Sequence, residues 1–341
     1  MRALASMLLL LATAVLAGVF AISRAPDPAA PLPPRDGPAL AAAKTWGYQL
    51  QYVDRLQVPE AIDMMVVDYS RDGTAARAFT PADVEALRRR PTGKPRIVLC
   101  YLSIGEAENY RAYWDQGWNS KPPQWLGAEN AAWKGNFAVR FWQPGWQRLI
   151  VESRRASLTL ATRIARALFP PRKPYLDEII EAGFDGVYLD RVDAYEKAQD
   201  ARPTAKSDMI AFVGAISAHA KARRPGFLVV PQNGEELLAD ARYRAMIDGV
   251  AKEDVFYGEG GDSTANPPVT TRAAIGLLNR AKADGLPVFV IEYIPDPERQ
   301  RTTLGNIRNL GFTGLFAERG LKQPPVLPPS AASGQTSPGP R

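Results

Sequence analysis

The sequence predicts a single (β/α)8 barrel, and three observations support this fold class. Short apolar runs alternate with stretches that carry helix signals, as expected for parallel strands joined by helices. Eight such runs lie within residues 45–321, a body of about 277 residues that has the size of such a barrel. An open doubly wound sheet fits less well, because no glycine-rich phosphate turn follows the first run near Gln51.

Each predicted strand is a short apolar run that ends at a polar residue. In chain order, the strands are expected at Tyr48–Gln51, Ile62–Asp68, Ile97–Leu102, Gly186–Asp190, Leu228–Pro231, Gly249–Glu253, Val288–Glu292 and Gly314–Glu318.

Helices are predicted where capping residues frame an apolar period. Thr80 supplies a capping hydroxyl before Pro81. Residues 173–182 place Leu176, Ile179 and Ile180 on one face, and this helix is expected to stop at Gly183. Another helix is expected to begin at Asp296-Pro297 and to end at Gly311.

Two regions depart from this simple alternation, and a third segment is rich in glycine. A long loop rich in Trp and Tyr, Gly105–Gly145, follows the third strand, where its aromatic rings could stack on sugars or form a small core of their own. The insertion Glu152–Lys173 is predicted to be a basic amphipathic helix packed on the barrel. The segment Gly258–Pro268 lacks the Gly-Lys-Ser/Thr of a phosphate loop and is expected to form a mobile rim.

The two ends of the chain differ in composition from the body. Residues 1–24 are predicted to be a signal peptide or an uncleaved anchor, because an apolar run from Ala3 to Ile22 follows Arg2. Residues 25–44 and 322–341 are rich in Pro, Ala, Ser and Gly and are expected to be a linker and a disordered tail. We therefore expect an exported protein, periplasmic or extracellular, that meets a membrane only through an uncleaved N-terminal segment.

Composition excludes several classes of function. The formal net charge of +6 falls to +3 once residues 1–40 and 322–341 are set aside, so a nucleic-acid partner is not expected. Cys100 is the single cysteine and His219 the single histidine, so disulfides, structural zinc sites and Ser-His-Asp catalysis are not expected. His219 has helical spacing with Phe212 and Ile216, which predicts a packed helix residue. No cofactor is expected, and the protein is expected to be a monomer.

Carboxylates are left to carry the chemistry, and they gather at the ends of the predicted strands. In a barrel these ends share one face and surround one opening, where catalytic groups are found. The polar residues at the ends are Gln49 with Gln51, Asp68, Ser103 with Glu106, Asp190, Gln232 with Asn233, Glu253, Glu292 with Tyr293, and Glu318 with Arg319. Two carboxylates can serve as the acid and the nucleophile or base of glycoside hydrolysis. The same cluster could instead bind Mg²⁺ or Ca²⁺.

Several motifs, taken together, resemble glycoside hydrolase family 114, the endo-α-1,4-polygalactosaminidase family. They are WGYQ (46–49), VLCYLSIGEAE (98–108), FWQPGWQ (141–147), YLDEIIEAGFDGVYLD (175–190), VVPQNGEEL (229–237), DGVAKEDVFYG (248–258), VFVIEY (288–293) and GFTGLFAER (311–319). The resemblance implies a barrel that acts on α-1,4-linked galactosamine polymers in bacterial exopolysaccharide systems.

The resemblance also implies roles for individual residues. Asp190, at the end of GVYLD, would be the nucleophile or base, and Glu253, in AKED, the general acid, although these two roles could be reversed. The remaining strand-end residues would bind the sugar: Asp68, Glu106, Gln232, Asn233, Glu292, Tyr293, Glu318 and Arg319. Two alternatives stay open, a non-catalytic carbohydrate-binding barrel and a metal-dependent barrel enzyme that acts on a small carboxylic substrate.

Overall fold

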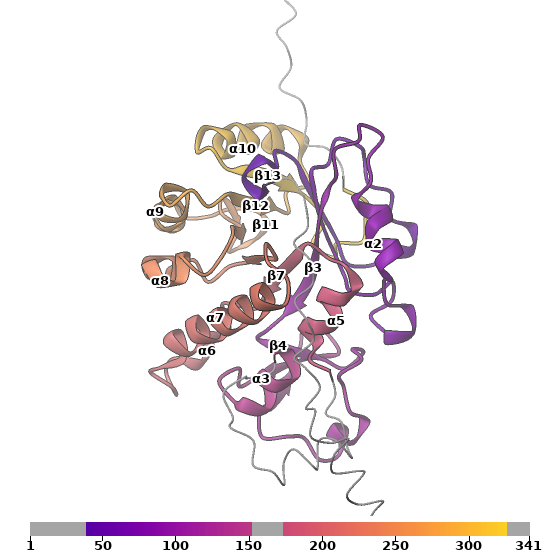
Figure 1. Ribbon diagram of the computed structural model, residues 1–341. Helices are drawn as coiled ribbons and strands as arrows, with labels where there is room; N and C mark the ends of the chain where they lie inside the picture. Colours follow the sequence, from indigo (N-terminus) through magenta and orange to yellow (C-terminus); the bar gives the residue numbers. More distant parts are fainter. Residues whose placement is uncertain (1–38, 152–172, 326–341) are drawn as a thin grey trace, which may run out of the picture.

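The computed structural model describes residues 39–151 and 173–325, which form an α/β fold with a parallel central sheet (Figure 1). Five parallel strands pair in the order β1 (Trp46–Gln49), β2 (Met64–Val67), β3 (Ile97–Ser103), β7 (Gly186–Asp190) and β8 (Leu228–Pro231). Three more pair in the order β13 (Thr313–Phe316), β12 (Val288–Glu292) and β9 (Val250–Glu253), also parallel. All eight predicted strands are confirmed, with bounds that differ by at most two residues.

Hydrogen bonds connect the two parallel sheets where β8 lies beside β9. Gln232 and Ala251 form a parallel bridge, and the Asn233 amide donates to the Ala251 carbonyl at 3.0 Å. On the opposite side, the amides of Leu50 and Gln51 donate to the carbonyl of Leu321, so the segments that follow β1 and β13 also meet.

Side-chain alternation divides the apolar residues of the strands between two cores. One cluster takes residues from all eight parallel strands, among them Trp46, Tyr188 and Phe289. The ring of Trp46 lies 5.6 Å from that of Phe289 and 6.2 Å from that of Tyr188. The other cluster joins the opposite strand faces to the helices. Since neighbouring residues of a strand point to opposite sides, residues two apart share the same core.

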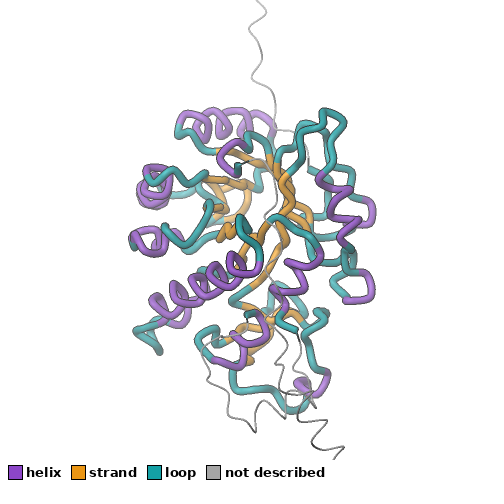
Figure 2. The backbone as a smooth tube through the Cα atoms, viewed as in Figure 1, coloured by secondary structure: helices purple, strands orange, loops and turns teal. Residues whose placement is uncertain are grey.

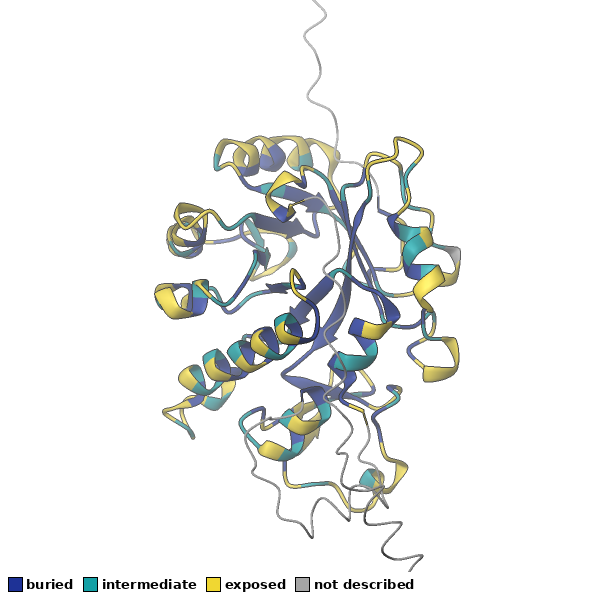
Figure 3. Cartoon of the chain, in the orientation of Figure 1, coloured by how far each residue is buried: buried dark blue, intermediate teal, exposed yellow. Residues whose placement is uncertain are grey.

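Helices surround the strands and expose their outer faces to solvent (Figures 2 and 3). The α-helices are α2 (Pro81–Arg88), α3 (Pro144–Ile150), α5 (Tyr175–Ala182), α6 (Ala194–Ala198), α7 (Ala205–Arg223), α8 (Ala241–Arg244), α9 (Pro268–Ala283) and α10 (Pro297–Asn309). Short 3-10 turns are η1 (Leu40–Ala42), η2 (Val53–Arg55), η3 (Ala75–Arg77), η4 (Gln116–Asn119) and η5 (Glu235–Ala239).

The predicted caps are confirmed in these helices. Thr80 and Asp83 form a reciprocal capping box at the start of α2. Gly183 ends α5 in the left-handed conformation with a φ of 96°, which a residue without a Cβ adopts at little cost. The Asp296 side chain accepts from the Arg299 amide and begins α10.

The aromatic loop after β3 forms a small sheet whose rings extend the core between strands and helices. Strands β4 (Glu106–Glu108), β6 (Asn136–Val139) and β5 (Leu126–Glu129) pair antiparallel in that order. Trp118 contacts both Trp114 and Trp125, with ring centroids 5.2 and 5.0 Å apart, and Trp125 also packs on Trp146. Trp114, Trp125 and Trp146 belong to the same buried cluster as the helices, so these rings pack on one another without forming a separate core. Trp133, at 46% exposed, remains on the surface.

The segments next to the predicted domain boundaries take part in the fold. Leu40 and Ala43 are buried, although they lie within the predicted linker, and Pro325, within the predicted tail, packs on Gly47. The predicted signal or anchor segment and almost all of the basic insertion lie outside the described residues. Among residues 39–151 and 173–325, no helix is long and apolar enough to cross a membrane.

Candidate active site

Asp190 and Glu253 lie at the carboxyl ends of β7 and β9, which flank β8. Asp190 is two residues after Tyr188, and Glu253 is two residues after Ala251. Tyr188 and Ala251 both belong to the core shared by the eight parallel strands. Alternation therefore turns both carboxylates toward the side of the strands on which this shared core lies.

Asp190 is held by a tyrosine and an amide from the two neighbouring strands. The Tyr101 hydroxyl, from β3, donates to Asp190 Oδ2 at 2.8 Å. Gln232 Nε2 donates to Asp190 Oδ1 at 3.1 Å, and Gln232 Oε1 accepts from the Tyr188 hydroxyl at 2.6 Å. Each oxygen of this carboxylate thus has a fixed donor, which restricts its orientation.

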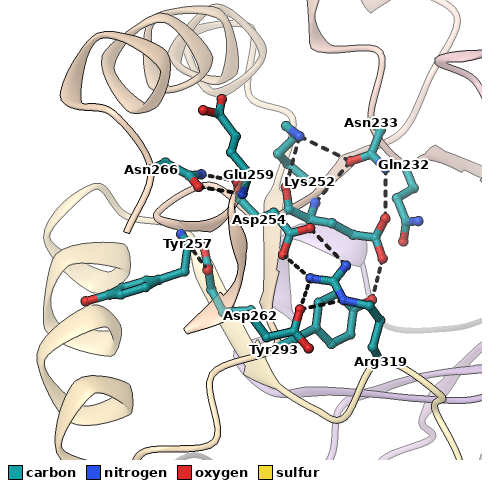
Figure 4. Close-up of polar contacts among 12 residues, drawn as sticks. Gln232, Asn233, Lys252, Asp254, Tyr257, Glu259, Asp262, Asn266, Tyr293 and Arg319 are labelled. Carbon is teal, nitrogen blue, oxygen red and sulfur yellow. Dashed lines mark hydrogen bonds and ion pairs between the residues drawn. The ribbon is translucent and has the colours of Figure 1, made fainter. Parts of the chain in front are cut away.

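Glu253 has a closely similar environment, drawn in Figure 4. The Tyr293 hydroxyl donates to Glu253 Oε1, and Asn233 Nδ2 donates to Oε2 at 2.9 Å. Asn233 Oδ1 accepts in turn from the Glu253 amide at 3.1 Å, which fixes the side chain of Asn233. The structure therefore places three predicted residues, Gln232, Asn233 and Tyr293, on the two carboxylates themselves.

The electrostatics of the pair favour a shared proton. Burial, and then the negative charge of Glu253, raise the pKa of Asp190 to about 7. Within the described ranges, neither Asp190 nor Glu253 forms an ion pair. The adjacent Arg191 lowers the pKa of Asp190, but less than burial and Glu253 raise it. Burial also raises the pKa of Tyr48, with Asp190 as a further cause, so this phenol stays protonated beside the pair.

The backbone is unusual directly after these strands. Arg191, Asn233 and Asp254 have φ values of 60°, 61° and 56°, in the left-handed region that residues with a Cβ seldom occupy. Arg191 follows Asp190, Asp254 follows Glu253, and Asn233 binds Glu253. Strained backbone of this kind gathers at functional sites, where surrounding contacts must hold it in place.

Asp68 and Glu106, two predicted sugar-binding residues, are buried in ion pairs beside the site. Asp68 binds Arg111, whose Nε also donates to Glu108 at 2.6 Å. Glu106 accepts from Asn130 at 2.9 Å, and its Oε1 lies 3.3 Å from Arg191 Nε. Both carboxylates are therefore engaged with protein cations near the pair, and neither contacts Asp190 or Glu253 by a hydrogen bond within the described residues.

The carboxylates of Glu292 and Glu318 accept hydrogen bonds from backbone amides away from Asp190 and Glu253. Glu292 is fully buried and accepts from the amides of Phe256 and Tyr257 at 2.9 and 3.2 Å. Burial raises its pKa to about 7, despite these donors. Glu318 accepts from the Lys322 amide and fixes the turn after β13. The structure does not bring these two carboxylates together with the pair.

Arg319 contacts the loop that follows Glu253. Its guanidinium binds Asp254 in a bidentate manner and also binds Asp262, in the hairpin of β10 (Tyr257–Gly258) and β11 (Gly261–Ala265). This hairpin occupies the segment expected to form a mobile rim, and Asn266 ties it to the Asp254 carbonyl at 2.8 Å.

Three residues of the site were missed by sequence reasoning: Tyr101, Arg111 and Asp254. Tyr101 could have been found, because it is two residues after Leu99 in an inward-facing run. Arg111 and Asp254 carry no such signal, since both lie in turns whose course depends on tertiary contacts.

The described residues contain no group of three or more His, Cys, Asp and Glu side chains that could hold a metal ion. Cys100 is buried in the core between the strands and the helices. His219 lies in α7, as predicted, and its Nε2 is 2.8 Å from Asp177 of α5.

A parallel α/β fold that brings two carboxylates without cationic partners to the ends of nearby strands fits the class of glycoside hydrolases. The sequence model of glycoside hydrolase family GH114 matches residues 24–332, and the chain belongs to this family. The family resemblance read from the motifs is thereby confirmed, and membership supports glycosidase activity.

Related proteins span most of the chain. An uncharacterized protein of Deinococcus radiodurans is 34% identical over 295 residues, which is 85% of each chain. An uncharacterized protein of Methanocaldococcus jannaschii is 35% identical over 273 residues, 77% of this chain and 70% of its own. The glycoside hydrolase domain of PelA from Pseudomonas aeruginosa has a similar fold, with a TM-score of 0.58 and 20% identity over 84% of this chain and 98% of that domain.

Proposed function

We propose that this protein is an exported, endo-acting glycosidase that cleaves α-1,4-linked galactosamine-containing polysaccharide with Asp190 and Glu253 as its catalytic pair. Family membership supports the glycosidase class, and the motif resemblance supports the substrate. The apolar run from Ala3 to Ile22 supports export.

One observation carries the proposal: two inward-facing carboxylates, each held by a tyrosine hydroxyl and an amide, share a site without a cationic partner among the described residues. One carboxyl donates its proton to the glycosidic oxygen as the bond to the anomeric carbon breaks. The other, ionised, attacks that carbon or removes a proton from the attacking water. The pair must therefore hold one proton, and the raised pKa of Asp190 supports this state near neutral pH.

The two roles can be assigned by experiment. The family resemblance makes Glu253 the acid, whereas the raised pKa of Asp190 favours Asp190 as the proton donor. A substrate with an activated leaving group, such as a dinitrophenyl glycoside, needs no acid. The variant that lacks the acid, whether Asp190→Asn or Glu253→Gln, should therefore still cleave this substrate.

We also propose that the eight parallel strands close into a barrel around the inner core. The Gln232–Ala251 bridge and the hydrogen bonds from Leu50 and Gln51 to Leu321 support closure at the two junctions between the sheets. The fold similarity to the PelA domain is consistent with it.

The test of the function uses the chain without residues 1–24 and a partly de-N-acetylated α-1,4-galactosaminan. New reducing ends are measured for the parent, Asp190→Asn and Glu253→Gln, with Glu298→Gln as a control, because Glu298 is exposed on α10. We expect release by the parent and the control and a fall of about 10³-fold or more in the two site variants.

Other outcomes separate the alternatives. Binding without release in all four proteins would contradict the proposal and favour a carbohydrate-binding barrel. Activity that disappears with a chelator and returns with Mg²⁺ or Ca²⁺ would favour the metal-dependent alternative. Release that survives both substitutions would mean that other residues are catalytic.

A further inference from the structure

Arg319 joins one guanidinium to two carboxylates and an aromatic ring. Nη1 and Nη2 each donate to an oxygen of Asp254 at 3.0 Å, and Nε donates to Asp262 Oδ1 at 2.7 Å (Figure 4). Its central carbon lies 4.2 Å from the centroid of the Tyr293 ring. A bidentate pair and a stacked ring fix a guanidinium in both position and plane.

Two of these three contacts lead to Glu253. Tyr293 donates its hydroxyl to Glu253 Oε1, so the position of its ring sets the position of that donor. Asp254 is the next residue in the chain, and its left-handed backbone, with a φ of 56°, directs the chain away from β9 at Glu253. A residue with a Cβ adopts this conformation only when its surroundings hold it there. Arg319 provides such a contact to the side chain of Asp254.

We propose that Arg319 is a positioning residue that fixes the orientation of Glu253 by bracing Tyr293 and neutralising Asp254. This inference rests on the proposed function. The structure directs the guanidinium of Arg319, a predicted sugar-binding residue, to Asp254, Asp262 and Tyr293.

The charges around Glu253 determine the consequence of losing the guanidinium. The titratable and charged groups near this carboxylate are Asp190, Tyr48, Tyr188 and Tyr293 from facing strands, Lys252 and Asp254 from its own segment, and Arg319. Without Arg319, Asp254 becomes an unpaired negative charge beside Glu253, and Tyr293 loses its stacked partner. Both changes loosen the contacts that hold the Glu253 carboxylate in its orientation.

The variants for the test are Arg319→Ala and Arg319→Lys. We expect Arg319→Ala to lower kcat by about 10- to 100-fold with KM within about twofold, as for loss of an interaction made in the transition state. Arg319→Lys should retain an intermediate kcat, because an ammonium keeps the charge but cannot form the bidentate contact. Thermal unfolding of each variant shows that it is folded, and Arg319→Lys keeps the proposal testable if Arg319→Ala does not fold.

A matched control separates the site from the hairpin. Arg299, in α10, donates to the Ser263 carbonyl at 2.8 Å, so Arg299→Ala removes an arginine contact to the same hairpin without touching Asp254 or Tyr293. This variant should keep the kcat of the parent.

An NMR measurement without substrate keeps this inference separate from the proposed function. Glutamate labelled with ¹³C at the carboxyl carbon gives a signal for Glu253, identified by its loss in Glu253→Gln. The chemical shift of this signal should change in Arg319→Ala and change less in Arg319→Lys, whether or not the polysaccharide is cleaved. An unchanged chemical shift in Arg319→Ala, a rise in KM with an unchanged kcat in that variant, or a loss of kcat in Arg299→Ala equal to that in Arg319→Ala would each overturn the proposal.

Discussion

In the proposed mechanism, Asp190 must exchange a proton while it lies beside a second carboxylate. Tyr101 is the group that most directly favours its ionised form, since the hydrogen bond from the phenol lowers the pKa that burial and Glu253 raise. The balance among these three influences, more than any one of them, determines where the pair loses its last proton.

Tyr101→Phe should therefore move the upper limb of the pH profile of kcat/KM to higher pH. The phenylalanine removes the donor at 2.8 Å but keeps the ring, so Asp190 holds its proton more tightly than at a pKa of about 7. Measurements of kcat/KM from pH 4 to 10 on the same polysaccharide give the position of this upper limb. A limb that stays in place, or moves down, would show that Asp190 does not titrate in the active pair.

Asp190→Asn should change how stability depends on pH. The pKa of about 7 in the folded chain lies above the ordinary aspartate value of 3.8, so folding favours the protonated form. This contribution to stability is complete below about pH 4 and is lost as the pH rises to about 7. Asparagine cannot ionise, so the variant should exceed the parent by roughly 1–3 kcal/mol at pH 8.

Thermal unfolding from pH 5 to 8 measures this effect. Glu292, whose pKa is also raised, is present in both proteins, so the difference between their slopes isolates Asp190. Parallel slopes for the two proteins would mean that the carboxyl is not desolvated as the structure shows.

The strands explain why part of the site could be predicted and part could not. All eight parallel strands follow from short apolar runs, and their shared orientation brings Asp190 and Glu253 to one end of the sheet. Treating every strand-end carboxylate alike included Glu292, whose side chain faces the loop after β9. Phe289 and Ile291 belong to the core shared by the eight parallel strands. Because successive side chains of a strand point to opposite sides, Glu292 lies on the other side of β12.

The small sheet after β3 was beyond sequence reasoning for a different reason. Strand β5 has the sequence LGAE and is largely exposed, so neither an apolar run nor alternation marks it. Its antiparallel pairing with β6 and the packing of Trp118 on Trp125 are contacts that no local strand pattern marks. The sequence indicated only that this region is rich in aromatic residues, which could stack on sugars or form a small core.

Trp133 is the ring of this sheet most available for a sugar. It lies in the turn between β5 and β6, flanked by Asn130 and Asn136, whose amides contact Glu106 at 2.9 and 3.5 Å. Trp133→Ala should raise KM for the polysaccharide by about 3- to 10-fold through lost stacking, with kcat nearly unchanged. Val269→Ala, at an exposed apolar residue of α9, is the matched control. Equal KM values for Trp133→Ala and the parent would remove this ring from the binding site.

The charges of the whole domain bear on capture of the substrate. The chain carries a net charge of +6, yet carboxylates outnumber arginines beside Asp190 and Glu253. Arg111 pairs with Asp68 and Glu108, Arg191 with Glu106 and Asp193, and Arg319 with Asp254 and Asp262. If the substrate is the proposed de-N-acetylated galactosamine polymer, which is cationic at neutral pH, this local excess of negative charge should attract it.

KM for the de-N-acetylated polymer should rise several-fold between about 0.05 and 0.5 M NaCl, because salt screens this attraction. KM for a fully N-acetylated polymer of the same length should change little over the same range. Identical salt dependence for the two polymers would indicate that charge does not contribute to recognition.

The most direct test of the whole proposal compares kcat/KM of Asp190→Asn, Glu253→Gln and the double variant on one α-1,4-galactosaminan. Two carboxyls that share one proton and one reaction act as a unit, so the double variant should be no slower than the slower single variant, with each at least about 10³-fold below the parent. Losses that multiply in the double variant, or release that survives in it, would contradict a paired mechanism at Asp190 and Glu253.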